Sequence, residues 1–196
     1  TAPTKTITTS WQPRLVELHI RLTARLQPVH RHELEDALVE FCREQGWGVD
    51  VVGGGTVFNK QVGEVEAADI ELQVESAHLV PEVLEVLGAM LAPKGSTWSL
   101  GDEDDPKPFG TMEGLALYLN DTDLPEEVYA STSAGEVYDE CTRLIQGIGR
   151  INSHLELPEE TALYMYGQSF EQMRERIQPF LDSYPLCERC RVVQIA

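Results

Sequence analysis

Apolar and polar residues alternate along residues 15–26, where Val16 and Leu18 are separated by charged or polar side chains. A period of two over this length is typical of a half-buried strand. From about residue 32 to 45 the apolar residues recur at helical spacing, and Gly46 then supplies the residue type that most often ends a helix. This part of the chain therefore predicts a strand followed by a helix.

The same criteria predict two further strands, a second helix and a short strand. Residues 49–58 indicate a strand that three central glycines interrupt or end, and residues 68–75 alternate again. The glycines favour a bulge or a bend over a phosphate-binding loop, because no helix follows them. A helix is expected over residues 80–91 and a strand over 96–100, which completes the element order of a ferredoxin-like fold.

The pattern repeats after an acidic, proline-containing loop at residues 101–108, which is a candidate domain boundary. The elements expected beyond it are a strand at 115–119, a helix at 135–146, a hairpin of 150–157 with 161–166, a helix opened by a capping box of Ser169 and Gln172, and a strand at 191–195.

We therefore expect an α+β chain of two tandem ferredoxin-like (β-α-β-β-α-β) units with antiparallel sheets. The first unit would span residues 14–108 and the second 109–196, after a flexible N-terminal segment of residues 1–13. No apolar run approaches the roughly 20 residues of a membrane span, and residues 1–12 lack the pattern of a secretory signal. A cytoplasmic protein with free thiols is the expectation.

The chain of 196 residues carries 33 acidic and 15 basic side chains, a formal charge of −18. A surface this negative argues against binding to nucleic acid or to anionic lipid, since both require lysine and arginine. The charge is also uneven. Residues 102–140 hold twelve acidic side chains and one basic one, Lys107, for a net charge of −11.

Tyrosines within this acidic stretch favour a protein-binding face, because interface cores favour Tyr and charged rims steer the encounter. The partner would be a basic protein. The residues expected to contact it are Asp102, Glu103, Asp104, Asp105, Asp121, Asp123, Glu126, Glu127, Tyr129, Glu136 and Tyr138.

Motifs that would indicate catalysis, a metal or a cofactor are weak. Cys187 and Cys190 form one Cys-x-x-Cys pair, but a structural zinc site needs four ligands and no second pair has matching spacing. Asp69 and Glu71 could act as paired carboxylates, although a solvated strand face explains them as well. We therefore expect no catalytic residue, no metal and no cofactor.

Five segments together resemble a family of small acidic bacterial proteins of the immunity type, which pair with polymorphic toxins. They are Gly-Gly-Gly-Thr at 53–56, Asp-Ile-Glu-Leu at 69–72, Leu-Ala-Pro-Lys-Gly-Ser at 91–96, Gly-Leu-Ala-Leu-Tyr-Leu-Asn at 114–120 and Ala-Leu-Tyr-Met-Tyr-Gly at 162–167. These segments belong to the scaffold, so the resemblance implies a class of protein and assigns no functional residue.

Three functions follow from these observations. The favoured one is an immunity-type inhibitor whose acidic surface occludes the cationic site of a basic toxin or enzyme, such as a nuclease. The alternative is a small-ligand-binding or regulatory α+β module without catalysis, since grooves between domains are preferred pocket sites. The third, an enzyme that uses Asp69, Glu71 and a histidine, ranks last because no motif fixes a role.

Overall fold

The computed structural model describes residues 14–196, so the expected N-terminal segment of residues 1–13 lies outside the described residues. The first half contains β1 (Val16–Leu22), α1 (Pro28–Glu44), β2 (Val49–Asn59), β3 (Glu64–Val74), the 3-10 turn η1 (Ala77–Leu79), α2 (Val80–Ala89), β4 (Thr97–Leu100) and β5 (Lys107–Pro108). The second half contains β6 (Glu113–Asn120), α3 (Glu126–Ser131), α4 (Ala134–Leu144), β7 (Gly149–Glu156), β8 (Glu160–Gly167), α5 (Phe170–Ser183), the 3-10 turn η2 (Pro185–Cys187) and β9 (Arg191–Gln194).

Both sheets are antiparallel and share one strand order. The first sheet runs β2-β3-β1-β4-β5 and the second β7-β8-β6-β9. In each half the first and third strands of the β-α-β-β-α-β order lie at the centre, which is the ferredoxin-like arrangement. The predicted fold class is confirmed. No helix in residues 14–196 is long and apolar enough to cross a membrane.

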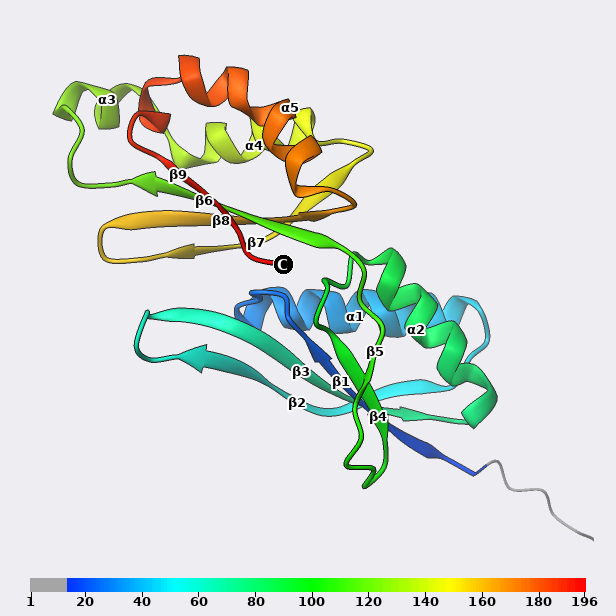
Figure 1. Cartoon of the computed structure of the whole chain (residues 1–196). Helices are drawn as coiled ribbons and strands as arrows, with labels where there is room; N and C mark the ends of the chain where they lie inside the picture. The colour runs from blue at the N-terminus through cyan, green and yellow to red at the C-terminus, as the bar shows by residue number, and fades with distance from the viewer. Residues whose placement is uncertain (1–13) are drawn as a thin grey trace, which may run out of the picture.

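The molecule is layered, with α4 and α5 on the second sheet, α1 and α2 beneath that sheet, and the first sheet at the bottom (Figure 1). The second sheet is therefore covered on both faces. Leu117 and its neighbours of the same parity pack in the core under α4 and α5, whereas Tyr118 and Tyr164 join the core of the first half. This explains why β6 and β8 are continuous apolar runs, while β1 alternates.

The structure extends several predicted elements. α1 begins at Pro28 and not near residue 32, because proline suits the first helical position. β2 is one strand through the three glycines, with register shifts between Val51 and Gly53 and between Val57 and Phe58. The expected bulge is present there. The short helix α3 and the short strand β5 were not predicted, since neither has enough residues to show a period.

Candidate functional site

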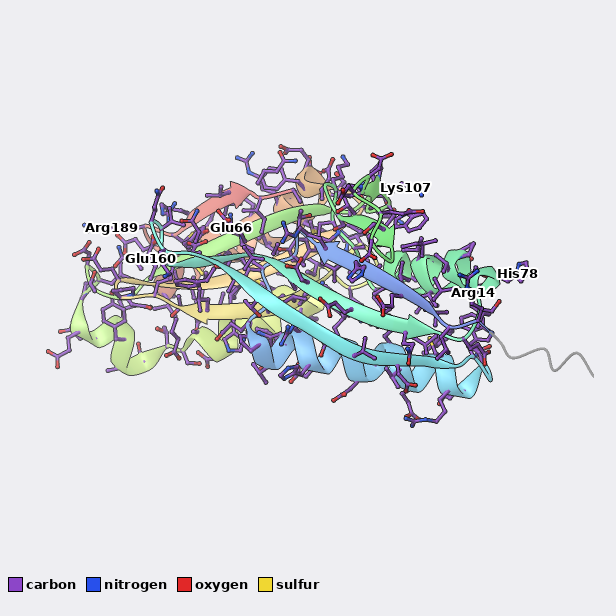
Figure 2. All side chains as sticks on the ribbon, turned by 90° about the horizontal axis from the view of Figure 1, so that it is seen from below. Arg14, Glu66, His78, Lys107, Glu160 and Arg189 are labelled. Atoms are coloured by element: carbon purple, nitrogen blue, oxygen red, sulfur yellow. The ribbon has the colours of Figure 1, made fainter. Side chains whose placement is uncertain are left out.

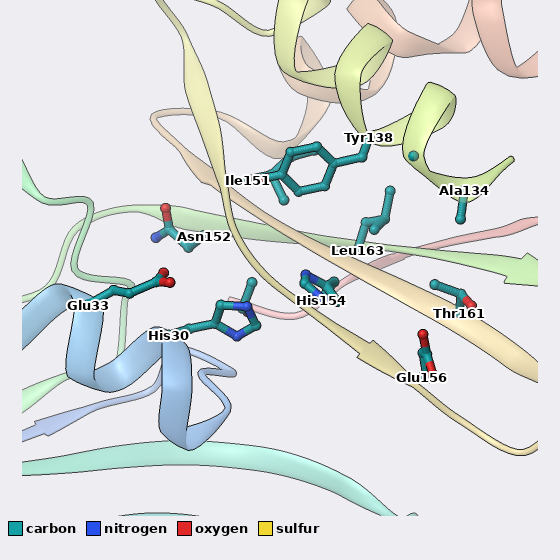
Figure 3. A pocket seen from close by; sticks show the side chains of 12 residues that line it. His30, Glu33, Ala134, Tyr138, Ile151, Asn152, His154, Glu156, Thr161 and Leu163 are labelled. Carbon is teal, nitrogen blue, oxygen red and sulfur yellow. The ribbon is translucent and has the colours of Figure 1, made fainter.

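A cleft lies between the two halves, where the first turn of α1 faces β7 and the start of α4 (Figure 3). Its volume is about 540 Å³. Ile151 and Leu163 give it apolar walls. We call it the junction cleft, and its polar and aromatic side chains are His30, Glu33, Tyr138, Asn152, Ser153, His154, Glu156 and Thr161.

Two histidines meet at the centre of the junction cleft. The rings of His30 and His154 pack edge to face with centroids 4.8 Å apart, and the ring of Tyr138 lies 6.5 Å from that of His154. Nδ1 of His30 is buried and has no hydrogen-bond partner within the described chain. Burial, and then repulsion from His154, lower the pKa of His30 below its ordinary 6.5, while Glu33 opposes them. His30 is therefore neutral at pH 7.

A bulge in β7 sets the positions of the facing side chains. Asn152 is the unpaired residue where the pairing of β7 with β8 shifts. The next residue, Ser153, turns toward the first half, and its Oγ donates a hydrogen bond to the carbonyl of Arg25. Nε2 of Gln27 donates to the carbonyl of His154. These bonds fasten the connection between β1 and α1 onto β7 and so hold the two histidines together.

A buried polar network fixes the same junction. Glu64, at the start of β3, accepts hydrogen bonds from Arg25 and from the hydroxyls of Tyr118 at 3.0 Å and Tyr164 at 3.3 Å. The guanidinium of Arg25 also donates to the Tyr118 hydroxyl at 2.9 Å, and its backbone N–H donates to the Tyr166 hydroxyl at 2.8 Å. Burial raises the pKa of all three tyrosines, so their hydroxyls stay protonated.

Five polar or aromatic side chains of the junction cleft have no internal partner among the described residues, in contrast to that network, whereas Ser153 and Thr161 are hydrogen-bonded. Within residues 14–196 no hydrogen bond or ion pair joins Glu33, Tyr138, Asn152, His154 or Glu156 through its side chain. The bonds that do reach Tyr138 and His154 from other side chains end on their backbone carbonyls. The cleft therefore presents donors and acceptors that are available to a ligand.

The predicted partner-binding acids fall into two groups. Residues 102–105 form the loop between β4 and β5, where a carboxylate oxygen of Glu103 lies 3.4 Å from Nζ of Lys107. Asp123 follows β6, and its carbonyl accepts a hydrogen bond from Arg189 at 3.3 Å. Figure 2 shows Arg189 near one end of the molecule and Lys107 well away from it, toward the other side. The acidic stretch of the sequence is thus not one surface.

The remaining predicted contacts lie on α3 and α4 and serve different purposes. Glu126 and Glu127 are exposed in the first turn of α3. Tyr129 is half-buried, and its hydroxyl accepts the backbone N–H of Leu124 at 3.0 Å and donates to the carbonyl of Asn120, at the end of β6, at 3.1 Å. Glu136 completes the capping box of α4. Tyr138 alone of the predicted residues lines the junction cleft.

The carboxylates considered for catalysis lie on the outer face of the first sheet. Asp69 forms a two-bond ion pair with Arg21, at 2.7 and 2.9 Å, and Glu71 is exposed beside it. In the described part of the chain no three His, Cys, Asp or Glu side chains are grouped so that they could hold a metal ion. The solvated-face interpretation fits this placement better than a catalytic pair.

Three cysteines gather in the second core, although the sequence links only two of them. Cys187 and Cys190 precede β9, and Cys141 of α4 lies in the same core, near enough to contribute to the raised pKa of Cys187. Burial, with smaller effects of neighbouring groups, raises the pKa of Cys141 and Cys187 to about 12. Thiols with such a pKa are weak nucleophiles at pH 7.

Sequence reasoning missed His30 and His154 as members of one site, because no spacing rule connects residues so far apart in the chain. One local signal was available. Pro28 can begin a helix, and a helix that begins there places His30 in its first turn at the boundary between a strand and a helix.

Comparisons with known proteins give no family. No family model and no curated protein matches the chain. Among solved structures, a mutant chlorite dismutase from Candidatus Nitrospira defluvii is 6% identical, with 92% of this chain and 90% of that one covered and a TM-score of 0.31.

Two other solved structures match at a similar level. The regulatory subunit of aspartate kinase from Thermus thermophilus is 12% identical over 85% of this chain and 95% of that one, with a TM-score of 0.27. The first two RRM domains of yeast Pub1 are 10% identical over 92% and 99%, with a TM-score of 0.25. At these values the comparisons carry no argument about function, and the fold assignment stands on the topology described above.

Proposed function

We propose that this protein is a binding module that holds a small ligand in the junction cleft. The observation that carries the proposal is the set of polar side chains that line the cleft without a hydrogen-bond or ion-pair partner among the described residues, namely Glu33, Tyr138, Asn152, His154 and Glu156. Polar groups in folded proteins usually have partners, so side chains that gather around a cavity with none among the described residues are free to bind a ligand. Clefts between domains are also among the preferred places for ligand pockets.

The proposal assigns no catalytic step to the cleft. Both of its aliphatic hydroxyls are engaged elsewhere, since Ser153 donates to the carbonyl of Arg25 and Thr161 donates to Asp121 at 2.7 Å. The imidazole of His30 is neutral at pH 7 and can accept or donate a hydrogen bond to a bound molecule. We place the protein in the cytoplasm, where its thiols would stay reduced.

The test is a small-molecule fragment screen read by NMR of the labelled protein. Fragments that bind should shift the side-chain resonances of His30, Tyr138 and His154 together. Ala134→Phe, at the start of α4 in the cleft wall, should fill the space and abolish those shifts. Ala130→Phe on the exposed side of α3 is the matched control and should leave them unchanged. A screen in which no fragment moves these resonances would refute the proposal.

A second candidate function is that of a bacterial immunity-type protein, which binds and inhibits a basic toxin. One observation favours it. Lys and Arg are absent from residues 108–142, and this stretch includes the exposed acids of the α3 end, Asp121, Asp123, Glu126 and Glu127. Such a field would speed the approach of a cationic protein by an order of magnitude or more.

Association kinetics with the partner co-purified from the native cell would test the inhibitor. Charge reversal at Glu126 and Glu127 should slow association about tenfold at low salt and much less at high salt. Reversal at Asp104 and Asp105, in the loop between β4 and β5, is the matched control for net charge. Equal rates for both variants and the parent would exclude electrostatic steering by the α3 end.

A further inference from the structure

The junction cleft has a one-sided electrostatic character. Of the residues that line it, the ones with a formal charge at pH 7 are Glu33 and Glu156, and no lysine or arginine is among them. Both carboxylates are exposed and lack a cationic partner within residues 14–196. Arg150 lies in the adjoining cleft, which continues past Glu33 and has a volume of about 240 Å³. An anionic ligand would be repelled here, whereas a cation would neutralise both carboxylates.

The two carboxylates stand at opposite ends of the junction cleft (Figure 3). Glu33 lies beside Asn152 at one end, and Glu156 lies beside Thr161 at the other. Between them are the rings of His30 and His154, with the ring of Tyr138 above. The cleft thus has a hydrogen-bond acceptor at each end and aromatic rings in its centre. It fits a linear molecule with a cation at each end and methylene groups between them.

Ammonium groups match the acceptors that are available. An ammonium donates up to three hydrogen bonds and accepts none, so it needs carboxylates, amide oxygens and hydroxyls, all of which are present at the two ends. Between the two ends, the rings of His30, His154 and Tyr138 offer an aromatic surface against which methylene groups can pack.

We propose that the junction cleft binds a linear aliphatic di- or triamine, with terminal ammonium groups at Glu33 and Glu156 and the methylene chain against the three rings. This inference rests on the proposed function and names its ligand class. A basic peptide segment offers the same charge, but its amide groups are broader than methylenes, and we favour the free amine.

Calorimetry at pH 7.5 and low salt tests the inference with spermidine and 1,4-diaminobutane as probes. Butylamine, which has one charge, and 1,4-butanediol, which has none, are the matched controls. The diamine should bind at least tenfold more tightly than butylamine, and the diol should not bind. Mg²⁺ at the same concentration should not displace spermidine. If spermidine bound only through general attraction to a chain of charge −18, any cation would compete with it.

Two variants connect the binding to the cleft. Glu33→Gln and Glu156→Gln should each weaken spermidine at least fivefold, since each removes one terminal charge pair. Both positions are exposed, so the amides should leave the fold intact, which circular dichroism checks. Glu40→Gln, on the same helix as Glu33 but paired with Arg43, is the matched control and should change affinity less than twofold.

Three results would overturn the assignment of an amine as the ligand. If Glu40→Gln weakened the affinity for spermidine as much as the two cleft variants do, or if Mg²⁺ displaced spermidine, the binding would be non-specific attraction to the charged surface. A tetralysine peptide that binds through Glu33 and Glu156 more tightly than spermidine would identify a basic peptide as the occupant. Absence of amine binding, while fragments still shift the resonances of His30 and His154, would reject the amine and leave the binding module standing.

Discussion

Removal of the Glu64 carboxylate should unfold the junction between the two halves more easily than any exposed acid would. Glu64→Ala leaves Arg25 without its counter-ion and leaves the hydroxyls of Tyr118 and Tyr164 without an acceptor. Glu64 is 8% exposed, so water cannot fully replace the carboxylate. The variant therefore loses a charge-assisted network and keeps the desolvation cost of its donors.

The magnitude follows from the burial of each partner. Loss of one member of a buried ion pair costs about 3–5 kcal/mol, and hydrogen bonds to a charged group contribute about 1.5–3 kcal/mol. The side chain of Arg25 is 25% exposed, so water screens part of the penalty. We expect Glu64→Ala to lower the free energy of unfolding by about 2–4 kcal/mol. Glu66→Ala, at an exposed position of the same strand, should cost less than about 1 kcal/mol.

Urea denaturation measures both variants. Tryptophan fluorescence reports the first half through Trp47 and Trp98, which pack against its core, and far-ultraviolet circular dichroism reports both halves. The midpoint should fall in both signals, because the core of the first half includes Tyr118 and Tyr164 of the second sheet. In a double-mutant cycle with Tyr118→Phe, the coupling to Glu64→Ala should be about 1 kcal/mol. A Glu64 variant no less stable than the Glu66 variant would refute the network's role.

Three further outcomes are expected. Gly54→Ala should lower the free energy of unfolding by about 1–3 kcal/mol, because Gly54 has a φ of +153° and the new Cβ would lie 2.5 Å from a carbonyl of β3. Gly88→Ala, in open space on α2, should raise it by about 0.5–1 kcal/mol. Urea denaturation that ranks the two variants otherwise would contradict this. Cys141 and Cys187, with a pKa of about 12, should resist a thiol reagent at pH 8 in the folded protein and react in urea; rapid native reaction would mean that burial does not protect them. The pKa of His30 is lowered by folding, so between that pKa and 6.5 the unfolded chain binds a proton that the folded chain lacks. The free energy of unfolding should therefore rise with pH in this window. Thermal unfolding of His30→Gln should show a smaller rise.

The fold could be predicted because each element carries its own periodicity. Alternation in β1 and β3 and helical spacing in α2 and α5 are local properties, and their order alone specifies the ferredoxin-like arrangement twice. Local rules failed where an element is short or begins unusually. The six residues of α3 are too few to show a period. The start of α1 at Pro28 was missed because proline suits the first position of a helix but breaks a helix elsewhere.

The candidate site could not be predicted to the same extent. The sequence identified acids by their density, but it could not show that Glu103 pairs with Lys107 while Asp123 contacts Arg189, which lies well away from Lys107. Only stacking of the second sheet over α1 brings His154 to His30, and only the bulge at Asn152 orients that part of β7 toward them. Contacts between residues this far apart leave no trace in spacing.

The chain's charge, its element order and its doubled ferredoxin-like pattern are thus determined by the sequence itself, because each depends on composition or on neighbours a few positions away. Tertiary structure decided which polar groups are satisfied. It placed Glu64 against Arg25 and two tyrosines, and within residues 14–196 it left the side chains of Glu33 and Glu156 without partners around a cleft. The physical reason is that hydrogen bonding and burial depend on distances in space, which packing of the two halves alone establishes.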